Sequence, residues 1–109
     1  MKRCGYVVQL RPEAVAEYKR VHEVVWPDVL AMIFECNIRN YTIFLREPES
    51  LLFATFDYIG SDLQVDMAKL AADPATQRWW KITDPLQQPL ASCESDEIWA
   101  EMEAVFHTD

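Results

Sequence analysis

The sequence predicts one α+β domain over residues 1–109, with elements in the order strand, helix, strand, strand, helix, strand. Three observations carry this prediction. The length suits one domain, alternating apolar and polar residues mark strands, and helical spacing marks the segments between them. This order is that of the ferredoxin-like fold, in which one antiparallel sheet carries helices on one face.

The N-terminal third predicts a strand followed by an interrupted helix. Residues 3–10 alternate between two faces, as a strand does. Pro12 suits the first turn of a helix, whereas Pro27 has no N–H to donate and interrupts it. We expect the helix to resume after Pro27 and to end near Asn37.

The middle of the chain predicts a β-hairpin and a second helix. Residues 40–45 and 51–58 have strand character, and Pro48-Glu49-Ser50 between them has turn chemistry. Gly60-Ser61-Asp62 marks the next break and offers an N-cap for the helix that follows it. Asp73-Pro74 ends this helix and begins a short one through the tryptophan pair.

The C-terminal segments are less regular. Residues 84–94 contain two prolines and no period, so we expect a loop. Residues 98–107 combine strand-like alternation with a helix-like composition, and we predict a strand from about Met102 onward. Helices on one side of a small sheet leave its other face uncovered, so we expect a homodimer that packs sheet against sheet as a dimeric α/β barrel.

Composition excludes several classes of function. A net charge of −8 disfavours nucleic acid and anionic membranes as partners. No apolar run approaches the roughly 20 residues of a membrane span, and the N-terminus lacks a signal-peptide core, so we expect a cytoplasmic protein. The three separated cysteines and two histidines predict no disulfide framework and no metal site. With only two glycines and no phosphate-binding loop, we also expect no cofactor.

Tyr18, His22 and Trp26 are the first candidate site residues. Spacing of four residues aligns them along one face of the predicted helix. Histidine titrates closest to neutral pH, so His22 can give or take a proton, and the Tyr18 hydroxyl can bind a ligand. The same spacing also fits a core stripe that contains a hydrogen-bonded histidine.

Trp79, Trp80 and Tyr41 are the second group of candidates. Adjacent residues on a helix point in different directions, so one tryptophan is expected in the core and the other at a cleft or interface. A flat indole suits the apolar face of a sugar ring, and the Tyr41 phenol can orient a ligand. On composition alone, core packing plus a dimer contact is the favoured explanation of the tryptophan pair, and a half-buried strand aromatic that of Tyr41.

Several blocks of sequence, in order along nearly the whole chain, resemble the L-rhamnose mutarotase family. The first has the pattern Y-x-x-x-H-x-x-x-W-P and the second the pattern N-Y-x-I-x-L. The blocks are Glu17 to Pro27, Asn40 to Leu45, Leu51 to Ala54, Gln77 to Lys81 and Glu103 to His107.

This resemblance implies a dimeric ferredoxin-like enzyme that interconverts the α and β anomers of a 6-deoxy-L-sugar without a cofactor. It implies His22 as the proton donor, and Tyr18, Tyr41, Trp79 and Trp80 as substrate-binding residues.

The sequence departs from the family pattern after the tryptophan pair. Residues 82–89 replace a loop that usually contains N-P-D-N-S-P, and residues 93–98 are also altered. The choice between L-rhamnose and L-fucose therefore stays open. Two other functions fit the same architecture, namely a cofactor-free monooxygenase and a non-catalytic sugar-binding module.

Overall fold

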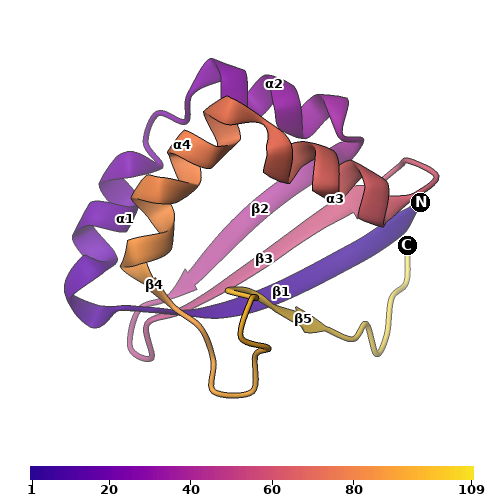
Figure 1. Ribbon diagram of the computed structural model, residues 1–109. Helices are drawn as coiled ribbons and strands as arrows, with labels where there is room; N and C mark the ends of the chain where they lie inside the picture. The colour runs from indigo at the N-terminus through magenta and orange to yellow at the C-terminus, as the bar shows by residue number, and fades with distance from the viewer.

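The computed structural model describes residues 1–109 and has the two predicted layers, an antiparallel sheet with helices over one of its faces (Figure 1). The elements, in chain order, are β1 (Lys2–Leu10), η1 (Pro12–Ala14), α1 (Val15–Val21), α2 (Pro27–Glu35), β2 (Ile38–Arg46), β3 (Leu51–Tyr58), α3 (Leu63–Ala72), α4 (Pro74–Thr83), η2 (Asp84–Leu86), β4 (Gln87–Gln88) and β5 (Ala100–Met102). No helix reaches the length and apolarity that a membrane crossing requires.

The sheet is built around β1. Its strand order is β2-β3-β1-β4, and β5 pairs with β1 on the same side as β4. The short strand β4 lies opposite Gln9 and Leu10, whereas β5 lies opposite Gly5 to Val7. The last strand of the predicted order is thus two short pieces, separated by residues 89–99.

The prediction of a final strand from Met102 onward was wrong. The strand β5 ends at Met102, and the residues after it form no regular element. No facing layer covers their apolar side chains, and Val105 and Phe106 are 91% and 82% exposed. The expected loop over residues 84–94 was also wrong in part, because it contains η2 and β4.

The predicted restart of the helix at Pro27 and its end near Asn37 are confirmed. Trp26 has extended backbone geometry, and α2 begins at Pro27. Strand β2 starts at Ile38, slightly earlier than predicted, and its register against β3 shifts between Arg39 and Thr42. Asn40 lies in this irregularity with a φ of 54°, and its side-chain amide donates to Asp57 at 2.9 Å. Tyr41 lies in the same irregularity, directly before regular pairing resumes at Thr42.

The core lies between the sheet and the helices. Inward-facing residues of β1 and β3, such as Val8, Leu10 and Leu52, are almost completely buried. They pack against Ala14 and Tyr18 from the first helical segment. The predicted cap before α3 forms at Asp62, and Asp73 also caps α4: the side chain of each accepts a hydrogen bond from the first turn of the helix that follows it.

The opposite face of the sheet carries apolar side chains that nothing in the chain covers. Phe44 of β2 pairs with Phe53 of β3, which in turn pairs with Val7 of β1. Phe44 is 57% exposed. Both faces of this sheet therefore offer apolar surface, but the helices cover only one.

Candidate active site

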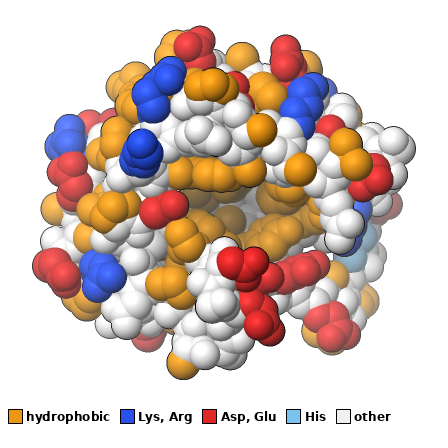
Figure 2. All heavy atoms as spheres, viewed as in Figure 1, with side chains coloured by type: hydrophobic (Ala, Val, Ile, Leu, Met, Phe, Trp, Pro, Cys, Tyr) orange, Lys and Arg blue, Asp and Glu red, His pale blue; other side chains and the backbone are white.

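A pocket opens between the sheet and the helices, and Figure 2 shows it as a hollow with hydrophobic side chains along its walls. The pocket has two connected parts. The large chamber has a volume of about 560 Å³, and the small chamber about 280 Å³. Both are lined by the same six side chains: Tyr18, His22, Tyr41, Ile43, Trp79 and Trp80. The five site residues predicted from the sequence therefore meet in one place.

His22 lies where α1 ends. The helix stops at Val21, and His22 is its C-cap residue. The expectation that Tyr18, His22 and Trp26 share one continuous helix was wrong, because Trp26 is already the N-cap of α2. The three rings still gather, since His22 stacks on Tyr18 at 4.2 Å between ring centroids, and both His22 and Trp26 meet Trp79 edge-on.

A hydrogen bond defines the tautomer of His22. Its Nδ1 lies 2.9 Å from the carbonyl oxygen of Tyr18. A carbonyl only accepts, so Nδ1 carries the hydrogen, and in the neutral ring the lone pair belongs to Nε2. Nε2 makes no hydrogen bond to the protein. Burial lowers the pKa of His22, and its bond to the Tyr18 backbone offsets part of this effect. Neutral imidazole therefore prevails at pH 7, ready to accept a proton.

The two tyrosines of the pocket stay protonated. Burial and the neighbouring Tyr41 raise the pKa of Tyr18, and the amide of Gln87 opposes this rise. Tyr41 exposes 43% of its surface, yet burial raises its pKa to about 12 because its phenol lies inside the pocket. Both phenols consequently present O–H groups to a ligand over the physiological pH range.

The two tryptophans of α4 have different environments, as predicted. Trp79 is 7% exposed and packs in a core cluster with Val29 and Ala75. Trp80 is 36% exposed. Both line the two chambers, so one ring forms a fixed wall of the pocket and the other a more accessible one.

The structure adds residues to the pocket that the sequence did not single out individually. They all follow the tryptophan pair and line the small chamber: Thr83, Asp84, Gln87, Ile98 and Trp99. The only sequence signal for them was the departure from the family pattern in this part of the chain. No three His, Cys, Asp or Glu side chains lie close enough together to hold a metal ion.

Comparisons with known proteins agree with the resemblance. The sequence model of the L-rhamnose mutarotase family matches residues 3–108. The L-rhamnose mutarotase of Escherichia coli O1:K1 is 32% identical over 108 residues, which cover 98% of each chain. That of Oceanobacillus iheyensis is 28% identical over 109 residues, the whole of both chains.

Solved structures show the same fold. The crystal structure of an L-rhamnose mutarotase from Formosa agariphila superposes with a TM-score of 0.80 over the whole of both chains, at 21% sequence identity. The family match extends over nearly every element described above, including α1 with His22 and α4 with both tryptophans. The chain belongs to the L-rhamnose mutarotase family, whose members are isomerases.

Proposed function

We propose that this protein interconverts the α and β anomers of a 6-deoxy-L-hexose without a cofactor, and that L-rhamnose is its substrate. One observation carries the proposal: a neutral His22, with Nε2 unpartnered, in a pocket walled by two tryptophans and two tyrosines. The names of the relatives support L-rhamnose as the sugar. L-Fucose, which differs in hydroxyl configuration, is the alternative substrate.

The chemistry requires one group that moves a proton between two oxygens. His22 Nε2 takes the proton of the anomeric hydroxyl, the bond between C1 and the ring oxygen breaks, and C1 becomes an aldehyde carbon. The resulting imidazolium then protonates the ring oxygen. Both oxygens were bonded to C1, so the same nitrogen reaches each of them. Rotation about the C1–C2 bond and the reverse steps close the ring on the other carbonyl face.

The role of proton donor, which the resemblance implies for His22, fits the second half of this exchange. The lowered pKa makes His22 a base first and an acid only after it has taken the substrate's proton. The Tyr18 and Tyr41 hydroxyls remain protonated and can donate hydrogen bonds to the sugar oxygens while charge develops there. We assign the reaction's proton transfers to His22 and its charge stabilisation to these phenols.

The walls of the large chamber support a 6-deoxy sugar. Trp79 and Trp80 offer flat faces for the C–H side of a pyranose ring. Aliphatic side chains from α2 and α3, including Val29, Ile33 and Leu70, line the same chamber. A methyl group at C6 can pack there, whereas a hydroxymethyl group would lose hydrogen bonds to water without finding partners.

Saturation-transfer NMR between the anomeric protons tests this function, with L-rhamnose and L-fucose measured in parallel. We expect catalysed exchange in the wild type, and a loss of about 10²–10⁴-fold in His22→Ala because general acid–base catalysis typically contributes that much. His107→Ala is the matched control, since His107 is exposed and contacts only Asp109.

Three outcomes would contradict the proposal. Exchange at the uncatalysed rate for both sugars would exclude mutarotation of either one. Sugar binding without any catalysed exchange would favour the non-catalytic sugar-binding module. Oxygen uptake with quinol-like substrates, together with no exchange, would favour the monooxygenase.

We also propose that two chains form a homodimer through the uncovered face of the sheet. Phe44, Phe53 and Val7 form an apolar row across three strands, and burial of such a row stabilises association. Light scattering should give a dimer for the wild type and a monomer for Phe44→Lys. Val65→Lys, at a position 61% exposed on α3, is the control and should remain dimeric. A cytoplasmic location stays a prediction from the sequence.

A further inference from the structure

The polar groups of the pocket are concentrated at one end. The large chamber is lined mainly by aliphatic and aromatic side chains, and none of its lining residues is acidic. The small chamber adds Thr83, Asp84 and Gln87, which come from the end of α4 and the η2–β4 segment. A sugar that extends from His22 into the small chamber would meet these groups with its hydroxyls.

Asp84 is the one acidic residue that lines either chamber. It is half-buried, and its carboxylate forms no hydrogen bond or ion pair within the protein. Burial raises its pKa. By contrast, the carboxylates of Asp62, Asp66 and Asp73 each accept hydrogen bonds from neighbouring groups. Partial burial of a carboxylate without a hydrogen-bond donor costs free energy of folding, unless a bound ligand or solvent supplies the donors.

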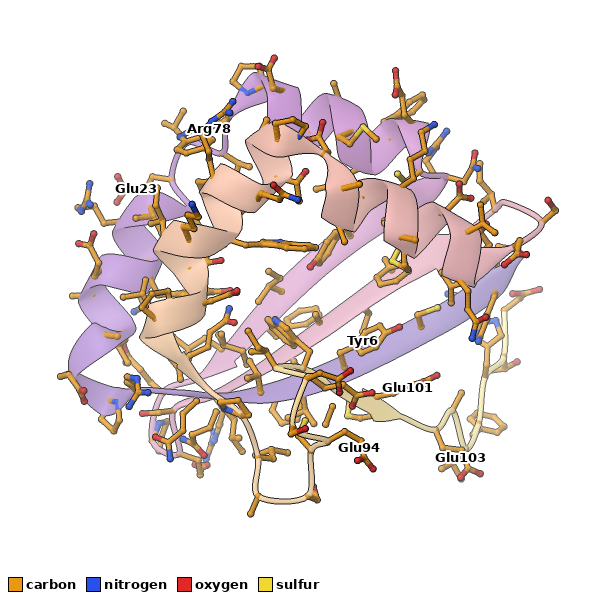
Figure 3. All side chains as sticks on the ribbon, in the orientation of Figure 1. Tyr6, Glu23, Arg78, Glu94, Glu101 and Glu103 are labelled. Carbon is orange, nitrogen blue, oxygen red and sulfur yellow. The ribbon has the colours of Figure 1, made fainter.

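Other acids at this side of the molecule do not share this position. Glu94, Glu101 and Glu103 come from the segment after β4 (Figure 3), and all three are exposed. None of them lines either chamber of the pocket. Asp84 is therefore distinguished by its position, and not by a general excess of negative charge.

Gln87 gives a second, independent sign that ligand atoms belong here. Its side chain is 4% exposed, and its Oε1 is the one buried side-chain oxygen or nitrogen that has no hydrogen-bond partner. Pairing of β4 with β1 holds Gln87 opposite Leu10. Buried polar atoms are almost always satisfied, so the unsatisfied amide oxygen of Gln87, which lines the same chamber as Asp84, indicates a site built for a polar ligand.

We propose that Asp84 is a substrate-binding residue that sets sugar specificity, its carboxylate accepting hydrogen bonds from two neighbouring hydroxyls of the bound sugar. This inference rests on the proposed function. L-Rhamnose and L-fucose carry the same substituents but differ in configuration at C2 and C4. When C1 lies at His22, a carboxylate held at the end of α4 can accept from a pair of hydroxyls in one of these sugars and not equally in the other.

The test compares Asp84→Asn with Asp96→Asn, which changes the charge equally at an exposed residue outside the pocket. Kinetics are measured by anomeric exchange with L-rhamnose and L-fucose, and binding by tryptophan fluorescence. For the preferred sugar we expect KM and Kd to rise about tenfold in Asp84→Asn, because a hydrogen bond to a charged group is lost. The kcat should stay within about twofold, since binding and not proton transfer is affected. Asp96→Asn should match the wild type.

A sugar analogue identifies the contact itself. Deoxy analogues of the preferred sugar, each lacking one ring hydroxyl, are titrated into wild type and Asp84→Asn. For each of the two analogues that lack a hydroxyl bound by Asp84, we expect binding to the wild type to weaken about tenfold and binding to the variant to match that of the parent sugar. Asp84→Ser provides a second variant, and thermal unfolding verifies that each one is folded.

Two results would overturn the role of Asp84. One is an unchanged KM and Kd for both sugars in folded Asp84→Asn and Asp84→Ser. The other is a loss confined to kcat, which would make Asp84 part of the proton transfer. Failure of the proposed function gives a different result, because the wild type would then catalyse the anomeric exchange of neither sugar.

Discussion

The two ends of the pocket are built in different ways. At one end, Tyr18, His22 and Trp79 are carried by α1 and α4 and are locked together by ring contacts of 4.2 and 5.3 Å. At the other end, Asp84, Gln87 and Trp99 come from a segment with little regular structure. The first end holds the proposed base, and the second end holds the polar groups that a sugar can use.

Under the proposed function, this difference separates catalysis from recognition. A proton-transfer group must keep its geometry, and the helix end with its backbone hydrogen bond provides that rigidity for His22. Hydroxyl recognition depends on a few polar contacts, and a connecting segment can change those without altering the core. The sequence departs from the family pattern in this second region, where substitutions that change the substrate preference destabilise the fold least.

The largest expected effect on stability tests the rigid end. Trp79→Ala should lower the free energy of unfolding by about 3–5 kcal/mol, because Trp79 is 7% exposed and packs in a core cluster. Trp99→Ala should cost about 1–3 kcal/mol, since Trp99 is only partly buried at the edge of its cluster. Chemical denaturation measures both values. Equal losses would mean that the two ends are equally integral to the core.

The pH dependence tests the state of His22. Its pKa is lowered, so the neutral base should predominate above that pKa, and kcat/KM should fall only as the pH drops below 6.5. The folded protein then binds fewer protons than the unfolded chain just below pH 6.5, so stability is lost as the pH falls through this window. His22→Gln should lack both dependences. If kcat/KM of the wild type already began to fall above pH 6.5, this would contradict the lowered pKa.

The smallest effect concerns the Tyr41 hydroxyl. Tyr41→Phe should raise KM by roughly 2- to 10-fold, the range expected for loss of one hydrogen bond to the sugar. Tyr6→Phe is the matched control, because Tyr6 stacks on Phe56 and lines neither chamber. Anomeric exchange kinetics of the two variants give the comparison. An equal KM for both would remove Tyr41 from the binding site.

Much of the fold could be predicted because its signals are local. Alternation identified β1, and Pro27 marked the start of α2. Gly60-Ser61-Asp62 and Asp73-Pro74 marked the starts of α3 and α4. The failures came where pairing partners are distant in the sequence. Strand β5 ends at Met102 because the residues beyond it find no facing layer, and no local pattern encodes that absence.

The candidate site divides in the same way. Spacing of four residues brought Tyr18 and His22 together, although it did not predict that the first helix ends at Val21, well before Trp26. Spacing by itself favoured a core stripe for these residues. Only the shared pocket distinguishes the two interpretations, because a stripe wholly within the core would line no cavity.

By itself, the sequence determined the order of elements, the family and the five residues of the aromatic end, because helix and strand periodicity act over a few neighbouring residues. Only the tertiary structure decided which groups complete the pocket. Pairing of β4 and β5 with the distant β1 returns the chain to the site, and this brings Asp84, Gln87 and Trp99 to face His22 across one cavity. These contacts join residues that are far apart in the sequence, so local sequence patterns cannot predict them.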